Sequence, residues 1–127
     1  MIGDKLADID RILIVQRQWL DLIFQGIKPW ELRTSGTRVR GWIALAESGS
    51  GLVVGKAKIV DSLQPLDPDA ALDDFDKHQV SDPALLAKWR YPWVMEGAQR
   101  FIEPIRYNHP PGAVIWVRIK DGVLVDG

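Results

Sequence analysis

The sequence predicts an α+β domain in which strands predominate, and two observations support this fold class. Near the N-terminus, a short apolar run of strand length is followed at once by a segment with helical periodicity. The rest of the chain consists mainly of short apolar runs separated by glycine, serine and proline. With 127 residues, 46% of them hydrophobic and 26% charged, the chain has room for one domain with a buried core. We therefore expect residues 1–127 to form a single domain, with its core over about 12–119.

The first strand and the first helix have the clearest signals. Ile12–Val15 is a continuous apolar run, which predicts a strand buried on both faces. Between Trp19 and Phe24 the apolar residues recur at helical spacing, which predicts a helix over residues 19–25. Gly26 stands where a left-handed turn would end that helix, and Pro29 disfavours its continuation.

The later elements follow from turn and capping signals. Residues 41–47 and 52–61 predict a hairpin around the turn 48–51, and residues 30–33 are expected to be extended. Asp67-Pro68 and Asp82-Pro83 each have the pattern of an N-cap followed by proline, which predicts two short helices. The last strands are expected at 93–95 and 113–119, joined by a loop over 104–111.

Charge and composition restrict the function. A net charge of −1 argues against binding long polyanions through bulk charge, so an RNA ligand would have to be recognised mainly in a pocket. The chain has no cysteine and two histidines, so we expect no metal site and no cofactor. No apolar run is long enough for a membrane span and no signal peptide is evident, so we expect a cytoplasmic protein without a membrane partner.

Three charged residues after the first helix are candidates for the chemistry. If residues 30–33 form a strand, Glu31 and Arg33 point to the same face, and Lys28 precedes them. A guanidinium offers a bidentate fork and a carboxylate accepts from an exocyclic amine, so this group suits a polar planar ligand such as a nucleobase. The alternative is that Glu31 merely pairs with a neighbouring cation at the surface.

The pattern Gly-x-Lys-x-x-Glu-x-Arg at 26–33, entered by a strand and a helix, resembles the hallmark of the ASCH domain family. Later segments are similar to the family as well: the Trp93 strand, the loop that ends in Tyr107-Asn108-His109, the closing strand with Trp116, and Gly55 before an inner strand. The resemblance covers roughly residues 12–119. It implies a PUA-like, mainly antiparallel β-barrel with flanking short helices, and a cleft that takes RNA or a modified nucleoside.

The resemblance leaves three functions open. Some ASCH domains are amidohydrolases acting on acetylated cytidine, and some are reported as ribonucleases. The amidohydrolases use a lysine, a threonine three residues later and a distant glutamate; here Lys28 matches the lysine, but Glu31 occupies the threonine position. In a hydrolase, Lys28 would be the charged or nucleophilic group and Glu31 the general base. The alternatives are a module that binds RNA or a modified nucleobase, and a protein-interaction domain whose tryptophans contact a partner.

Several further residues are candidate ligand contacts. Residues 26–40 hold four cations and one anion, so Arg38 and Arg40 are expected near phosphates unless this loop is simply solvated. Trp30 is expected either to stack on a base or to join the core. Tyr107 and His109 lie in a proline-bounded loop, where ligand contacts are common. The expected ligand-binding set is therefore Lys28, Trp30, Glu31, Arg33, Arg38, Arg40, Tyr107 and His109.

Other residues are expected to be structural. The six aspartates between residues 61 and 76 would repel phosphates and should face away from the ligand. His78 is expected on a polar helix, without a role in binding. Trp93 and Trp116 are expected in the core.

Overall fold

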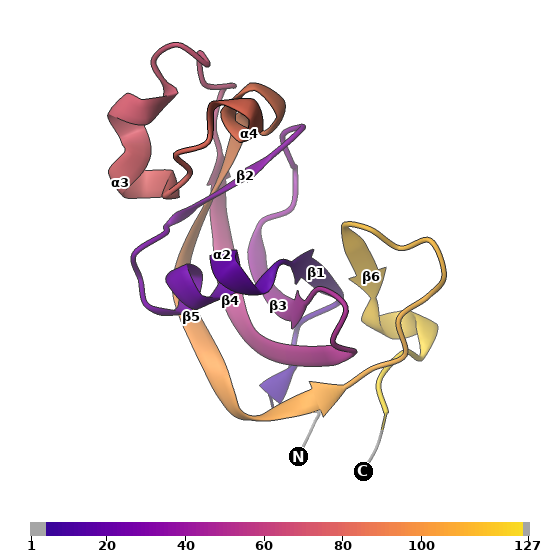
Figure 1. Ribbon diagram of the computed structural model, residues 1–127. Helices are drawn as coiled ribbons and strands as arrows, with labels where there is room; N and C mark the ends of the chain where they lie inside the picture. Colours follow the sequence, from indigo (N-terminus) through magenta and orange to yellow (C-terminus); the bar gives the residue numbers. More distant parts are fainter. Residues whose placement is uncertain (1–4, 126–127) are drawn as a thin grey trace.

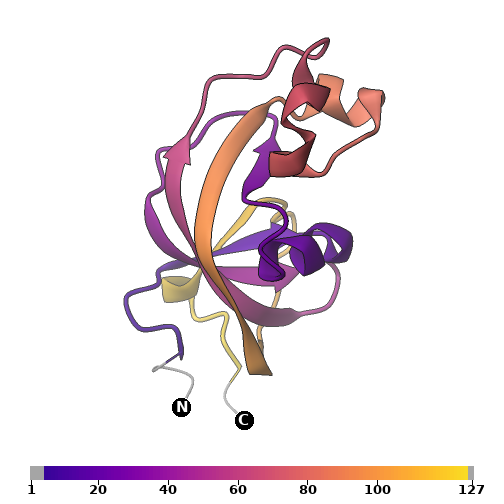
Figure 2. The same ribbon diagram turned by 90° about the vertical axis from the view of Figure 1, so that its left-hand side faces the viewer.

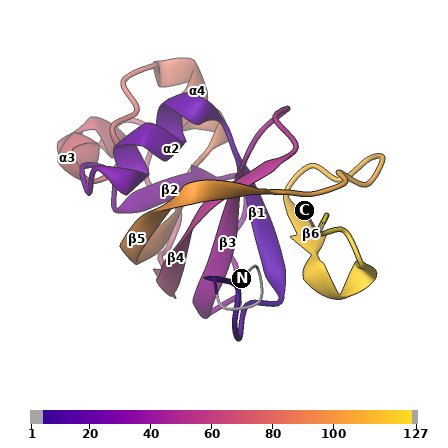
Figure 3. The same ribbon diagram turned by 90° about the horizontal axis from the view of Figure 1, so that it is seen from below.

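A computed structural model describes residues 5–125 as a six-stranded mixed sheet curled into a half-barrel, with a few short helices beside it (Figures 1, 2 and 3). The strand order is β2-β5-β4-β3-β1-β6. The strands are β1 (Arg11–Val15), β2 (Trp30–Arg33), β3 (Gly41–Glu47), β4 (Leu52–Ser62), β5 (Tyr91–Arg106) and β6 (Trp116–Arg118). The helical elements are α2 (Arg17–Phe24), η1 (Ala71–Asp74), α3 (Phe75–His78), α4 (Pro83–Lys88) and η2 (Ile119–Asp121).

The predicted fold class is confirmed, because neighbouring strands are antiparallel at every pairing except that of β1 with β3. In that parallel pair Ile12 lies beside Ala44 and Val15 beside Glu47. The predicted hairpin is also confirmed, since β3 and β4 pair around the turn at 48–51.

The sheet is buried on both faces around β1, which explains the continuous apolar run in that strand. Ile12 and Ile14 pack on one face with Ala44 of β3. Leu13 and Val15 pack on the other face with Leu45 and with the inner side of α2. We call the face of Leu13 the inner face of the half-barrel, and the face of Ile12 the outer face.

Side chains, not a strand ladder, close the half-barrel. Trp93 of β5 and Trp116 of β6 stack with ring centroids 5.8 Å apart and planes 11° apart, although three strands lie between β5 and β6 in the sheet. The indole Nε1 of Trp93 donates to the carbonyl oxygen of Ser35 at 2.8 Å. We call this contact between β5 and β6, across the open side of the half-barrel, the seam.

The first helix ends as the sequence predicts. Gly26 has φ +77° and donates to the carbonyl of Ile23, and Ile27 donates to the carbonyl of Leu22, which together form a Schellman motif. This turn directs the chain from α2 into β2. Gly55 lets α2 lie close to the sheet, because a Cβ there would lie 2.5 Å from the ring of Phe24.

Three element predictions were wrong. Asp67-Pro68 does not begin a helix, since the Asp67 carboxylate accepts from Asp69 in a local turn and the 3₁₀-helix η1 begins at Ala71. The strand expected at 93–95 is β5, which extends to Arg106 and therefore takes in the first part of the expected 104–111 loop. The closing strand expected at 113–119 is limited to Trp116–Arg118. By contrast, Asp82 caps α4 as predicted, accepting from the backbone N–H of Ala84 at 2.9 Å.

Across residues 5–125, no helix is long and apolar enough to cross a membrane.

Candidate functional site

A cavity of about 350 Å³ lies at the seam, between the two ends of the sheet and the short helices. Strands from the two sides of the sheet contribute to it: Ile14 belongs to β1, which lies next to the end strand β6, and Glu31 and Arg33 belong to the other end strand, β2. The segment between β4 and β5 adds Val80, Lys88 and Trp89. The other lining residues are Gln16, Trp19, Lys28, Leu32, Thr34, Ser48, Val114 and Ile115.

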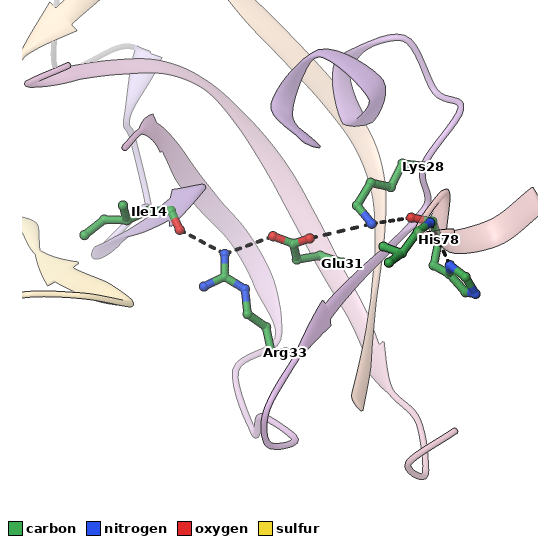
Figure 4. Close-up of polar contacts among 6 residues, drawn as sticks. Ile14, Lys28, Glu31, Arg33 and His78 are labelled. Atoms are coloured by element: carbon green, nitrogen blue, oxygen red, sulfur yellow. Dashed lines mark hydrogen bonds and ion pairs between the residues drawn. The ribbon is translucent and has the colours of Figure 1, made fainter. Parts of the chain in front are cut away.

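The three predicted residues Lys28, Glu31 and Arg33 converge on this cavity and form a continuous polar row (Figure 4). The ammonium of Lys28 donates to the backbone carbonyl of His78 and lies 3.8 Å from Glu31 Oε1. Arg33 donates to Glu31 Oε2 at 2.9 Å and to the carbonyl of Ile14 at 2.9 Å. The row therefore ties β2 to β1 on one side and to the end of α3 on the other.

Lys28 is an unusual lysine because its side chain is only 1% exposed. Its pKa is lowered from 10.5 to about 8, chiefly by burial; the nearby Glu31 opposes this shift, and Arg33 contributes a smaller lowering. The Nζ atom also lies 4.9 Å from the ring centroid of Trp19, within range of a cation–π contact. At neutral pH, the cavity thus contains a buried ammonium that is close to its deprotonation range.

The carboxylate of Glu31 supplies the negative charge of the row. It is 5% exposed and lies between the ammonium of Lys28 and the guanidinium of Arg33. A carboxylate offers about four acceptor positions. Among the described residues, Arg33 donates a hydrogen bond to Oε2, whereas Oε1 has only the ion-pair contact with Lys28 at 3.8 Å. Glu31 can therefore accept from a ligand donor while it keeps its bond to Arg33.

Tryptophans form the apolar walls of the cavity. Trp19 comes from α2 and Trp89 follows α4. Within the described part of the chain, the buried Nε1 atom of Trp19 has no hydrogen-bond partner. Val114 and Ile115 lie at the rim with 76% and 39% of their surface exposed. A planar ligand could lie against these aromatic and aliphatic groups while its polar edge meets the row.

His78 does not fit the expectation of a polar helix residue, because it is completely buried. Its Nδ1 accepts from the backbone N–H of Val80 at 3.0 Å. The other ring nitrogen, Nε2, must then carry the hydrogen and donate to the carbonyl of Ala71 at 2.7 Å. The ring thereby holds the backbone turn whose carbonyl receives Lys28, so His78 supports the site without entering it.

The remaining predicted ligand contacts lie outside the cavity lining. Trp30 is partly buried on β2 and does not line the cavity. Arg38 is exposed, and Arg40 bonds to the carbonyls of Thr37 and Val39 and lies 3.7 Å from Asp61. The structure thus assembles three of the eight predicted ligand contacts in the cavity, while the role of the others stays a prediction.

Tyr107 and His109 act on the cavity indirectly. The hydroxyl of Tyr107, whose pKa is raised by burial, lies 2.9 Å from His109 Nδ1. His109 Nε2 donates to the carbonyl of Ala113 at 2.7 Å. These bonds fix the loop that brings Val114 and Ile115 to the rim, so both residues hold the edge of the site in place.

Neither tryptophan wall was predicted from the sequence. Helical spacing indicates Trp19 only as an apolar helix position, and no pattern distinguishes Trp89. A signal for Trp19 does exist: it lies nine residues before Lys28, at the start of a helix whose end delivers that lysine. No such local signal connects Trp89 with the motif.

No cluster of three or more metal-ligating acidic or histidine side chains occurs within residues 5–125.

Comparison with known proteins agrees with this architecture. The family model described as the ASCH domain matches residues 13–111. The crystal structure of ASCH from Zymomonas mobilis superimposes with a TM-score of 0.66 at 15% identity, covering 88% of this chain and 90% of that one. A serine-to-alanine mutant of that protein gives 0.65 at 15% identity, covering 88% and 90%; a tyrosine-to-phenylalanine mutant gives 0.54 at 14%, covering 76% and 72%. At this identity the likeness establishes the fold alone, and no curated protein matches the sequence.

Proposed function

Because the chain belongs to the ASCH domain family, we propose that the cavity at the seam binds a nucleobase, either in a modified nucleoside or in single-stranded RNA. The observation that carries this proposal is the convergence of Lys28, Glu31 and Arg33 on one cavity with tryptophans beside them. At about 350 Å³, the cavity falls within the range of about 300–1,000 Å³ typical of small-molecule sites.

The polar row supplies the groups that distinguish one base from another. Glu31 can accept from an exocyclic amine, and the ammonium of Lys28 can donate to a ring carbonyl. Apolar walls from Trp19 and Trp89 suit the faces of the ring, because every base offers a surface for stacking. In this arrangement the polar row distinguishes one base from another, and the tryptophan walls favour a planar ring.

The charge of the cavity suits a nucleotide better than a free cation. Lys28, Arg33 and Lys88 contribute three positive charges to the lining, against the single carboxylate of Glu31. Lys88 is exposed, so it can contact a phosphate that remains outside the cavity.

Replacing Glu31 with glutamine tests base recognition. The variant keeps the shape of the side chain but exchanges half of its acceptor capacity for donors. We expect the affinity ratio between the preferred base and the others to fall, with a loss of about 1–3 kcal/mol in the difference between their binding free energies, the value of one good bidentate contact. Calorimetric titration with a panel of nucleosides and short RNAs measures this ratio.

The control is Glu103→Gln, the same substitution on the exposed part of β5. It should leave every affinity in the panel unchanged. Because the ratio is taken within one variant, a general loss of stability cancels. An unchanged ratio in Glu31→Gln would show that Glu31 is only a structural ion-pair partner.

A hydrolase acting on the same class of ligand is the second candidate, and the lowered pKa of Lys28 is the observation that favours it. An amine with a pKa of about 8 is partly deprotonated near neutral pH and can act as a base or nucleophile. In that case Lys28→Met should reduce release of acetate from acetylated cytidine, or RNA cleavage, by about a hundredfold or more while binding survives. Wild-type protein that binds without turnover would favour the binding function.

A further inference from the structure

The outer face of the half-barrel carries a basic and aromatic surface that is separate from the cavity. Trp42 on β3 is 37% exposed, although large apolar side chains on the rest of this face are mostly covered. It pairs across the ladder with Lys58 on β4, and directly opposite residues of neighbouring strands share a face. Lys56, two positions before Lys58, extends over the indole with its ammonium 4.9 Å from the ring centroid.

The indole of Trp42 is held in place at one edge. A Cβ at position 97 would lie 3.1 Å from its outermost ring carbon, so the ring rests against Gly97 of β5. The side chain is therefore positioned on three neighbouring strands and still exposed. A tryptophan fixed in this way loses little conformational freedom when a planar group stacks on it.

Further cations lie on the chain that leads to this surface. The loop at 34–40 begins at Thr34 in the cavity lining and ends directly before β3, and it carries Arg38 and Arg40. Arg40, two positions before Trp42, lies 3.7 Å from Asp61. Including Lys56 and Lys58, there are four cations against the two carboxylates Asp61 and Glu96.

We propose that Trp42, Lys56 and Lys58 form an outer platform for single-stranded RNA, with Arg38 and Arg40 guiding the strand between the platform and the cavity. Exposed aromatic rings beside cations are the features that bind single strands, through base stacking and phosphate contacts. The proposal rests on the proposed function and makes it more specific: the base in the cavity then belongs to an RNA strand, and a free nucleoside binds there as a fragment of that ligand.

The test compares an unstructured mixed-sequence RNA of about 12 nucleotides, a length typical of single-strand sites, with single nucleosides. Trp42→Ala should weaken binding of the RNA by about 5- to 150-fold, the effect of losing one base stack, and leave nucleoside binding in the cavity unchanged. Trp42→Phe should retain most of the affinity. Lys58→Gln should reduce the slope of log K against log salt by about 0.7, one phosphate contact on a single strand.

Phe75→Ala is the matched control, since Phe75 is 40% exposed but lies among the aspartates of the 61–76 segment. It should leave RNA binding unchanged. RNA affinity that is the same in Trp42→Ala as in wild type would overturn the proposal. So would equal losses for RNA and nucleoside, which would show that Trp42 acts through the fold, or competition by oligoglutamate as strong as that by RNA, which would indicate an acidic protein as the partner.

The outcomes separate this proposal from the one on which it rests. Trp42-dependent binding of RNA without any nucleoside binding would support the platform and remove the function of the cavity. Nucleoside binding in the cavity with Trp42-independent RNA affinity would leave the proposed function standing and overturn the platform.

Discussion

Replacing Glu31 with leucine is expected to lower the free energy of unfolding by about 3–5 kcal/mol, the range for removing one partner of a buried ion pair. The side chains of Lys28 and Glu31 are 1% and 5% exposed, so bulk water solvates these charges poorly. The variant would leave the ammonium of Lys28 and the guanidinium of Arg33 beside one another without a counter-charge. Denaturant unfolding at neutral pH measures the loss.

The double variant Lys28→Met/Glu31→Leu should recover most of that stability, because the remaining cation, Arg33, is 17% exposed and keeps its bond to the carbonyl of Ile14. Replacing a buried ion pair by apolar groups of similar volume is often neutral or stabilising, because the desolvation cost of both charges is removed. Asp21→Ala serves as a surface control: Asp21 and Arg100 lie 2.8 Å apart but are 45% and 49% exposed, so the expected loss is at most about 1 kcal/mol. A loss in Glu31→Leu no larger than in this control would contradict a buried, mutually dependent charge row.

This pattern also bears on function. If the apolar double variant is as stable as the wild-type protein, the ion pair of Lys28 and Glu31 contributes no net stability to the fold. Its energetic cost is then better explained by a ligand that needs those charges than by folding.

The second large effect is a gain of stability at alkaline pH that depends on Lys28. Below pH 8 the ammonium is protonated in both the folded and the unfolded chain, and the folded state bears the full cost of burying it. Between about pH 8 and 10.5 the amine is neutral when folded but protonated when unfolded, so unfolding takes up a proton and stability rises with pH. The rise is on the order of 3 kcal/mol for this difference in pKa.

Other groups titrate in the same range, so the informative quantity is the difference between wild type and Lys28→Met. Unfolding free energies of both proteins, measured at intervals from pH 7 to pH 10.5 at constant ionic strength, give that difference. The free energy of unfolding of the wild-type protein should rise relative to that of the variant as the pH increases through about 8. Parallel curves would mean that Lys28 keeps an ordinary pKa in the folded protein.

The parts of the fold that sequence predicted well are those determined by local chemistry. Ile12–Val15 could be identified as a strand because both of its faces are buried, so every residue is apolar. Gly26 identified the end of α2 because the chain adopts a left-handed conformation there. Lys28, Glu31 and Arg33 could be grouped because strand alternation places the last two on one side.

The parts that were missed depend on distant contacts. Strand-like alternation is interrupted along β5, since its pairing with β4 shifts register at three points along the strand, and Ile102 in its second half is fully exposed. The closing strand is short because the bonds of Tyr107, His109 and Ala113 hold the preceding residues in a loop. His78 has polar neighbours in sequence, and its burial depends on two backbone partners, Val80 and Ala71, that its spacing did not reveal.

The most direct test of the central claim, that the cavity at the seam binds a nucleobase, is to follow the indole N–H signals of the six tryptophans by NMR during titration with nucleosides. We expect saturable shifts for Trp19 and Trp89, which line the cavity, at ligand concentrations that leave Trp30 and Trp42 unaffected. Two results would contradict binding of a nucleobase in the cavity. One is that no nucleoside of the panel shifts the signals of Trp19 and Trp89; the other is that only tryptophans outside the cavity lining shift.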